Sequence, residues 1–127
     1  MKKTGILNAP LNAAIARLGH GHLVAIADCG LPVPDGVQTV DLALVKGIPS
    51  FAQVLTAVLA DVEVEGAVMA AEAAGTGVER VLADAGLEPE TVSHEEFKAL
   101  LPSVRLIVRT GEATPFANVL LRSGVTF

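Results

Sequence analysis

The chain has 127 residues, 51% of them hydrophobic, with a net charge of −5, one cysteine and neither Trp nor Tyr. This length predicts one domain, residues 1–127. The acidic net charge and the lack of Trp and Tyr exclude the basic surface and the aromatic stacking platform of a nucleic-acid-binding protein. No stretch approaches the roughly 18 uncharged apolar residues of a membrane span. The lone cysteine and the lack of a signal-peptide pattern favour a cytoplasmic protein without a membrane partner.

The first third of the chain predicts a helix, a strand and a stiff loop. Asn8 followed by Pro10 is typical of a helix start, and Gly19 is expected to end this helix. Residues 23–27 are a short apolar run typical of a buried strand. The segment 29–36 is rich in proline and glycine, which excludes both a helix and a central strand.

The middle of the chain continues this alternation. Residues 37–44 alternate apolar and polar side chains and predict a strand. Ser50 is expected to cap a helix over residues 51–59, whose apolar side chains share one stripe. Residues 67–71 predict another buried strand, and residues 78–85 predict a further helix.

The last third predicts one more helix and two more strands. Ser93 is expected to cap a short helix over residues 94–100. Residues 104–108 and 119–121 predict strands, and we expect the apolar tail, residues 124–127, to be docked rather than exposed. Strands that alternate with helices predict an α/β fold: a three-layer single domain with a largely parallel central sheet covered by helices.

The chain is more apolar than is usual for a soluble monomer of its size, with a mean hydropathy of +0.54. One explanation is a parallel sheet that is buried on both faces, whose strands are nearly continuous apolar runs. Another is burial between subunits, because obligate interfaces resemble a core cut in half. The two explanations are compatible.

Three polar positions lie near predicted element ends and are candidates for a site. His20 follows the first helix, where it could act in catalysis or could simply stabilise the helix end through the dipole. Asp28 follows the first strand, at the sheet edge where α/β proteins bind ligands, or else it caps the following loop. Residues 109–118 carry several hydrogen-bonding groups after another strand, or form an ordinary surface connection. The residues alone leave these alternatives open.

Motifs for metals and cofactors are weak or missing. The glycine-rich phosphate-binding motifs are absent. His20 and His22, two residues apart, could chelate a metal across a strand edge, but the usual zinc-ligand spacing is lacking. Cys29 has no catalytic signature around it and is expected to be a small buried residue. We therefore expect neither a metal nor a cofactor.

A set of segments, in order and at compatible spacing, resembles the D-ribose pyranase and L-fucose mutarotase family. These segments are residues 18–20 (LGH), 26–36 (IADCGLPVPDG), 47–51 (GIPSF), 93–98 (SHEEFK), 109–118 (RTGEATPFAN) and 124–127 (GVTF). The resemblance runs nearly end to end. Residues 27–32 and 111–115 favour the ribose branch of the family.

The resemblance implies an activity, a site and an assembly. The implied activity is an isomerase that interconverts the beta-pyranose and beta-furanose forms of free D-ribose without a cofactor. His20 falls on the family's catalytic histidine, and we expect it to move protons to and from the sugar beside Asp28. The implied sugar-binding residues are Asp28, His94, Phe116, Ala117 and Asn118. The family also forms ring-shaped homo-oligomers, typically decamers, with sites near subunit contacts.

Two positions depart from the family pattern. Phe116 stands where the family usually has Tyr, so a hydroxyl group that could bind the sugar is missing. His22 stands where members commonly carry Asp. These departures favour two alternatives to a ribose isomerase: a non-catalytic sugar-binding accessory of ribose uptake, and a mutarotase for another sugar such as L-fucose.

Overall fold

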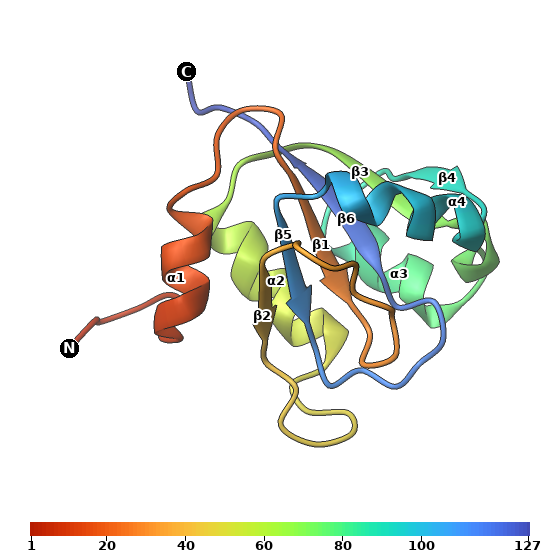
Figure 1. Ribbon diagram of the computed structural model, residues 1–127, viewed down its shortest axis with the longest axis horizontal. Coiled ribbons are helices and arrows are strands. Elements are labelled where there is room, and N and C mark those ends of the chain that lie inside the picture. Colours follow the sequence, from red (N-terminus) through yellow and green to blue (C-terminus); the bar gives the residue numbers. More distant parts are fainter.

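The computed structural model describes residues 1–127, which form one six-stranded sheet with helices on both faces (Figure 1). The helices and strands, in chain order, are α1 (Ala9–Ile15), β1 (Leu23–Ala27), β2 (Thr39–Asp41), α2 (Phe51–Asp61), β3 (Val64–Ala70), η1 (Ala71–Ala73), α3 (Gly77–Asp84), β4 (Glu90–Val92), α4 (His94–Leu100), η2 (Leu101–Ser103), β5 (Leu106–Arg109) and β6 (Val119–Ser123). The strand order across the sheet is β2-β5-β1-β6-β3-β4. No helix is long and apolar enough to cross a membrane.

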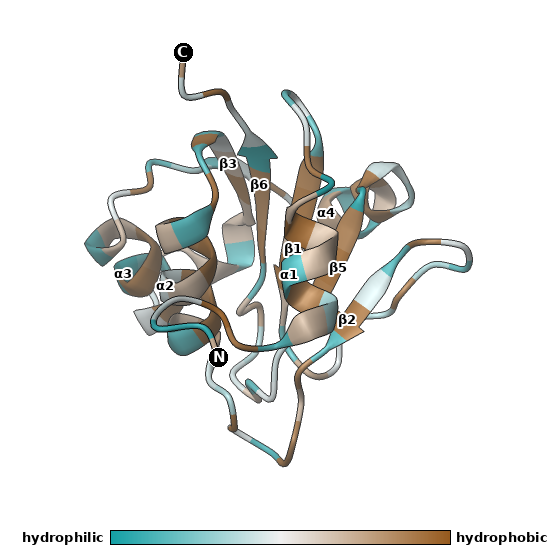
Figure 2. Ribbon diagram, turned by 90° about the vertical axis from the view of Figure 1, so that its left-hand side faces the viewer, coloured by the Kyte–Doolittle hydropathy of each residue, from teal (hydrophilic) through white to brown (hydrophobic).

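The two faces of the sheet are covered unequally. A core cluster of 20 buried residues lies between one face and α1, α2 and α3, while a cluster of 8 lies beneath α4 and η2 on the other face. Alternation along β1 explains the division, because Val24 and Ile26 join the large cluster and Ala25 and Ala27 join the small one. Figure 2 shows the apolar strands enclosed between the helices.

Strand direction decides which loops meet at each edge. All strands except β6 run in one direction, and β6 is antiparallel to both of its neighbours, β1 and β3. The carboxyl edge, where β1, β2, β3 and β5 end, therefore also holds residues 110–118, which lead into β6. The opposite amino edge holds residues 19–22 and the chain's C-terminus, as Gly21 N–H donates to the Ser123 carbonyl at 2.7 Å. In Figure 1 these edges lie at the bottom and the top.

The expected three-layer α/β fold with a largely parallel sheet is confirmed. The helix starts also follow the predicted chemistry. The Asn8 side chain accepts a hydrogen bond from Leu11 N–H, and Ser50 and Ser93 each form a reciprocal capping box with the third residue of their helices. Local hydrogen bonding therefore fixes where α1, α2 and α4 begin.

Three predictions about segments were wrong. The first helix ends at Ile15 rather than at Gly19, because Arg17 N–H and Leu18 N–H donate to carbonyls only three residues back. The strand expected over residues 37–44 is limited to Thr39–Asp41, because the chain then leaves the sheet as an arm, residues 42–49. The C-terminal tail does not pack against its own chain: Val125 is 40% exposed and Phe127 is fully exposed. Figure 2 shows the tail projecting beyond β6.

Candidate functional site

A cavity of about 370 Å³ opens at the carboxyl edge of the sheet. The loops that follow β1, β4 and β5 line this cavity, and Lys46 of the arm also lines it. Its lining residues are Asp28, Cys29, Gly30, Leu31, Pro32, Lys46, His94, Glu112, Ala113, Thr114, Pro115 and Phe116. Open α/β sheets bind ligands outside the carboxyl ends of their strands, so the position suits a ligand, and the lining combines apolar surface with a few polar and charged side chains.

Asp28 and Asn118 form one hydrogen-bonded unit at the base of this cavity. Asn118 Oδ1 accepts from Asp28 N–H at 2.8 Å, and Asn118 Nδ2 donates to Asp28 Oδ2 at 2.9 Å. Gly30 N–H donates to the other carboxylate oxygen at 2.9 Å. Asn118 is fully buried and does not line the cavity, as is also true of Ala117. The Asn118 amide therefore orients the Asp28 carboxylate, which faces the cavity.

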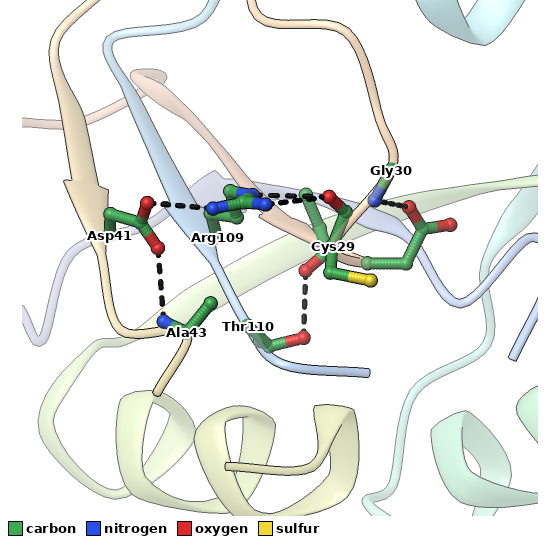
Figure 3. Close-up of polar contacts among 8 residues, drawn as sticks. Cys29, Gly30, Asp41, Ala43, Arg109 and Thr110 are labelled. Carbon is green, nitrogen blue, oxygen red and sulfur yellow. Dashed lines mark hydrogen bonds and ion pairs between the residues drawn. The ribbon is translucent and has the colours of Figure 1, made fainter. Parts of the chain in front are cut away.

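Arg109 supports the loop that forms one wall of the cavity (Figure 3). Its guanidinium donates two hydrogen bonds to the Cys29 carbonyl, at 2.9 and 3.2 Å, and pairs with Asp41 at 2.8 Å. Burial raises the pKa of Asp41, but a hydrogen bond from Ala43 N–H and the nearby guanidinium outweigh it and hold that pKa below its ordinary value. Cys29 was expected to be buried, yet it is partly exposed because the loop presents it to the cavity.

Glu112 organises the neighbouring loop of the cavity, and its carbonyl accepts a hydrogen bond from Cys29 N–H at 2.8 Å. Its carboxylate accepts hydrogen bonds from Phe51 N–H at 3.1 Å and from the Thr114 hydroxyl at 2.8 Å, together with the backbone N–H groups of Ala113 and Thr114. Burial raises the pKa of Glu112, but these donors outweigh it and bring the pKa below its ordinary value. The carboxylate thus joins the start of α2 to the loop that carries Phe116.

His94 and Phe116 meet at the far side of the cavity. Their rings make an edge-to-face contact with centroids 5.0 Å apart and planes at 77°. The Glu72 carboxylate accepts from His94 N–H at 2.8 Å and so ties the start of α4 to the end of β3. Phe116 adopts a φ of +62°, a conformation that non-glycine residues rarely adopt and that clusters at functional sites. His94 Nδ1 is buried without a hydrogen-bond partner.

His20 does not lie beside Asp28, contrary to our expectation. The two residues flank β1 at opposite ends, and its five residues span roughly 17 Å. His20 is at the amino edge, with its side chain 60% exposed, and its Nε2 lies 2.9 Å from Glu65 Oε2 at the start of β3. A resemblance along the chain gives no information about which sheet edge a residue occupies, so the separation was missed.

The structure thus brings together only part of the predicted site. Asp28, His94 and Phe116 line one cavity, Ala117 and Asn118 lie buried behind it, and His20 lies elsewhere. Sequence reasoning did not single out Arg109, Glu112 or Glu65, and Lys46 was also missed. Arg109 and Glu112 belong to the polar segment of residues 109–118. Their position at the end of β5 and just after it is the feature of the sequence that could have identified them.

Metal-ligating side chains do not gather anywhere in the chain: no group of three or more His, Cys, Asp or Glu residues is placed to hold an ion. His22, the possible partner of His20 in chelation, instead accepts a hydrogen bond at Nδ1 from Gly19 N–H at 2.9 Å. This bond stabilises the turn that carries His20.

Comparison with known proteins identifies relatives of this chain. The model of the RbsD / FucU transport protein family matches residues 1–126. A protein named D-ribose pyranase from Corynebacterium glutamicum (strain R) is 53% identical over 127 residues, and one from Cutibacterium acnes is 50% identical over 127 residues; each match covers 100% of both chains.

Solved structures agree with the sequence matches. The structure of Bacillus subtilis RbsD complexed with D-ribose superposes with a TM-score of 0.94 at 43% identity, covering 100% of both chains. The fucose mutarotase of Streptococcus pneumoniae, solved with L-fucose, shares the fold at 18% identity with a TM-score of 0.78, covering 95% of each chain. On the full-length match to the family model and relatives of about half identical sequence, the chain belongs to the RbsD / FucU family.

Proposed function

We propose that the protein is a D-ribose pyranase, an isomerase that interconverts the beta-pyranose and beta-furanose forms of free D-ribose. The observation that carries this proposal is the match, at 43% identity and a TM-score of 0.94, to a Bacillus subtilis protein solved with D-ribose. The fucose mutarotase is much less similar, at 18% identity, which supports ribose over L-fucose. The lone cysteine and the free-sugar substrate support action in the cytoplasm.

The chemistry requires proton transfer and no change in oxidation state. The ring opens when the ring oxygen gains a proton and the anomeric hydroxyl loses one, and it closes through a different hydroxyl group. A group that titrates near neutral pH can serve as both acid and base, and histidine has this property. We assign this role to His20.

The cavity at the carboxyl edge is assigned to the sugar. Asp28 accepts hydrogen bonds from sugar hydroxyls, because its carboxylate is held in place by Asn118 and Gly30. His94 contributes an imidazole edge, and Phe116 packs on the apolar face of the ring. Ala117 and Asn118 lie buried behind the cavity lining, and Asn118 acts on the sugar indirectly, by orienting the Asp28 carboxylate.

A second copy of the chain supplies His20 to this cavity. His20 lies at the amino edge of its own subunit and is 60% exposed, so it can reach a neighbour's carboxyl edge but not its own. The arm beside the cavity exposes Leu44, Val45 and Ile48 to the extent of 78%, 57% and 54%, an apolar surface suited to a subunit contact. We therefore propose a homo-oligomer, a decamer as in the family, whose sites lie between subunits.

One observation favours a second candidate function. Without a neighbour, the cavity holds Asp28, His94 and Phe116 but not His20, the histidine assigned as the proton shuttle. A chain that binds ribose in this way without catalysis would be an accessory of sugar uptake. Binding and catalysis are separated by one experiment.

The test is NMR exchange spectroscopy on the anomeric signals of D-ribose. Wild type is expected to accelerate exchange between pyranose and furanose signals, and His20→Ala is expected to lose most of this acceleration, roughly 10²-fold or more for an acid/base group. His22→Asn is the matched control, because its Oδ1 can still accept the Gly19 hydrogen bond.

The outcomes separate the candidates. Saturable ribose binding by wild type with no accelerated exchange identifies the accessory module and overturns the isomerase. Full activity in His20→Ala keeps the isomerase but overturns the role of His20. Equal losses in His20→Ala and His22→Asn indicate damage to the shared turn rather than loss of a proton shuttle.

A further inference from the structure

The contact between His20 and Glu65 is well defined although it lies at the surface. His20 Nε2 and Glu65 Oε2 are 2.9 Å apart, which is within the range of a strong charge-assisted hydrogen bond. The two residues come from different elements, the loop before β1 and the start of β3, and are 45 positions apart in the chain. The His20 Nδ1 atom makes no hydrogen bond within the chain.

The chemistry of the two groups determines which imidazole nitrogen carries the proton. A carboxylate can only accept hydrogen bonds. A neutral imidazole donates from one nitrogen and accepts at the other. Because Nε2 faces the carboxylate, Nε2 carries the hydrogen and Nδ1 presents the free lone pair.

We propose that Glu65 is a positioning residue that holds His20 in the Nε2–H tautomer, so that Nδ1 is the nitrogen that exchanges protons with the sugar. This inference rests on the proposed function, in which His20 is the acid/base. When Nδ1 takes a proton from the anomeric hydroxyl, the imidazolium that forms already faces the Glu65 carboxylate. The proton then leaves from Nδ1 to the ring oxygen, and the Nε2 proton stays in its bond to Glu65 throughout.

The backbone around the pair supports such a role. Gly21 N–H donates to the Ser123 carbonyl at 2.7 Å, and Ser123 N–H donates to the His22 carbonyl at 2.9 Å, so the loop is fixed to β6 at Gly21 and His22. β6 in turn pairs with β3, which carries Glu65. The register of the β3–β6 pair shifts between Val64 and Gly66, so Glu65 lies at a β-bulge, an irregularity that redirects a side chain, and it contacts a loop whose backbone is fixed to β6.

The direct test is ¹⁵N NMR of the histidine rings. The chain has only three histidines, so ¹⁵N-histidine labelling yields few signals, and His20→Gln identifies those of His20. In wild type we expect a protonated Nε2 and an unprotonated Nδ1. Addition of D-ribose should shift the Nδ1 signal with saturation and leave the Nε2 signal nearly unchanged.

Glu65→Gln supplies the second arm of the test, with Glu63→Gln as its matched control. Both variants remove one negative charge from the same sheet edge, but only Glu65 contacts His20. An amide can donate as well as accept, so it does not select a tautomer. We expect Glu65→Gln to average the two ring ¹⁵N signals and to lower kcat by roughly 10-fold, since hydrogen bonds to charged groups are the stronger ones. KM for ribose should change less than kcat.

The inference is overturned if ribose perturbs Nε2 rather than Nδ1 of His20 in wild type. It is also overturned if Glu65→Gln keeps both the tautomer and kcat, or if Glu63→Gln lowers kcat equally. Failure of the proposed function looks different, because wild type then gives no accelerated ribose exchange at all. The wild-type ribose titration decides the question even if Glu65→Gln does not fold.

Discussion

Asn118 illustrates how a residue of a binding segment can act through another residue, here Asp28, rather than by touching the ligand. The resemblance placed it against the sugar, whereas its amide is buried and bonded to both the backbone and the carboxylate of Asp28. Asp28 could be identified from its position after a strand, because ligand sites in α/β sheets gather there. The pairing across 90 positions could not be identified, because nothing local in the chain fixes which side chain meets it.

His94 is a second case in which local signals were insufficient. Ser93 and its capping box could be predicted, so the start of α4 was placed correctly. The first residue of a helix has no periodicity that shows where its side chain points. Only the tertiary contact with Phe116 turns the His94 ring toward the cavity.

Glu112 predicts a pH dependence of stability. Its pKa in the folded state lies below the ordinary value, so folding favours the ionised carboxylate. This contribution is present above the ordinary glutamate pKa and is lost as the pH falls through the lower folded-state pKa. We expect Glu112→Gln to lower the free energy of unfolding by about 1–3 kcal/mol near neutral pH and by less in acid.

Urea unfolding of wild type and Glu112→Gln across the acid range measures this difference. Glu63→Gln is the control, because its side chain makes no such set of hydrogen bonds and its effect should be small at every pH. A constant difference between wild type and Glu112→Gln down to the lowest pH would contradict the assignment.

At the scale of elements, the arm of residues 42–49 depends on a single glycine. Gly47 N–H donates to the Gly111 carbonyl, and Gly111 N–H donates to the Pro49 carbonyl at 2.9 Å. A Cβ atom at Gly111 would lie 2.3 Å from the Ile48 carbonyl oxygen, far inside normal contact. Only glycine lets the arm approach the end of β5 this closely.

Gly111→Ala is therefore expected to displace the arm. Overpacking of this kind costs about 1–3 kcal/mol of stability, and displacement of Lys46 should raise KM for ribose. Thermal unfolding and the ribose exchange assay measure the two effects. Gly77→Ala is the control, because nothing lies within 4 Å of its Cβ position in the first turn of α3. Unchanged stability and KM in Gly111→Ala would show that the arm can shift without consequence.

The same arm explains why one strand was predicted too long. Residues 42–45 are all apolar and extend the strand pattern of β2, but Leu44 and Val45 are exposed, so their apolar character does not indicate burial in the core. Strand β4 was missed for the opposite reason. It is a three-residue edge strand with little apolar pattern, and it forms because it pairs with the backbone of β3 along the edge that β6 does not occupy. Helices with side-chain caps were predicted well, since their signals are local.

At the scale of the whole molecule, the split between His20 and Asp28 predicts complementation between subunits. Co-expression of His20→Ala and Asp28→Asn chains, each inactive alone, should restore roughly one quarter of wild-type exchange activity, as expected when random pairing joins intact halves of a site between copies. Measurement uses the purified mixed oligomer.

The control for complementation is the two variants purified separately and then mixed without subunit exchange, which should stay inactive. Activity absent from the co-expressed oligomer, with its size unchanged, would place the whole site within one chain.

The excess apolar character could be noted from composition, but the sheet edge on which each group lies required the fold. For this reason we propose that a neighbouring copy, rather than the chain alone, completes the site.

The position of β6 has a consequence for how the protein is made. This strand, Val119–Ser123, is translated after every other strand of the sheet, yet it lies between β1 and β3 in the middle of the sheet. While it is still inside the ribosome, nothing joins the three strands β2-β5-β1 to the pair β3-β4, and both core clusters lack its buried side chains. The nascent chain therefore cannot complete its sheet until β6 has left the ribosome, and a stop codon before residue 119 is expected to abolish the fold rather than to remove one edge strand.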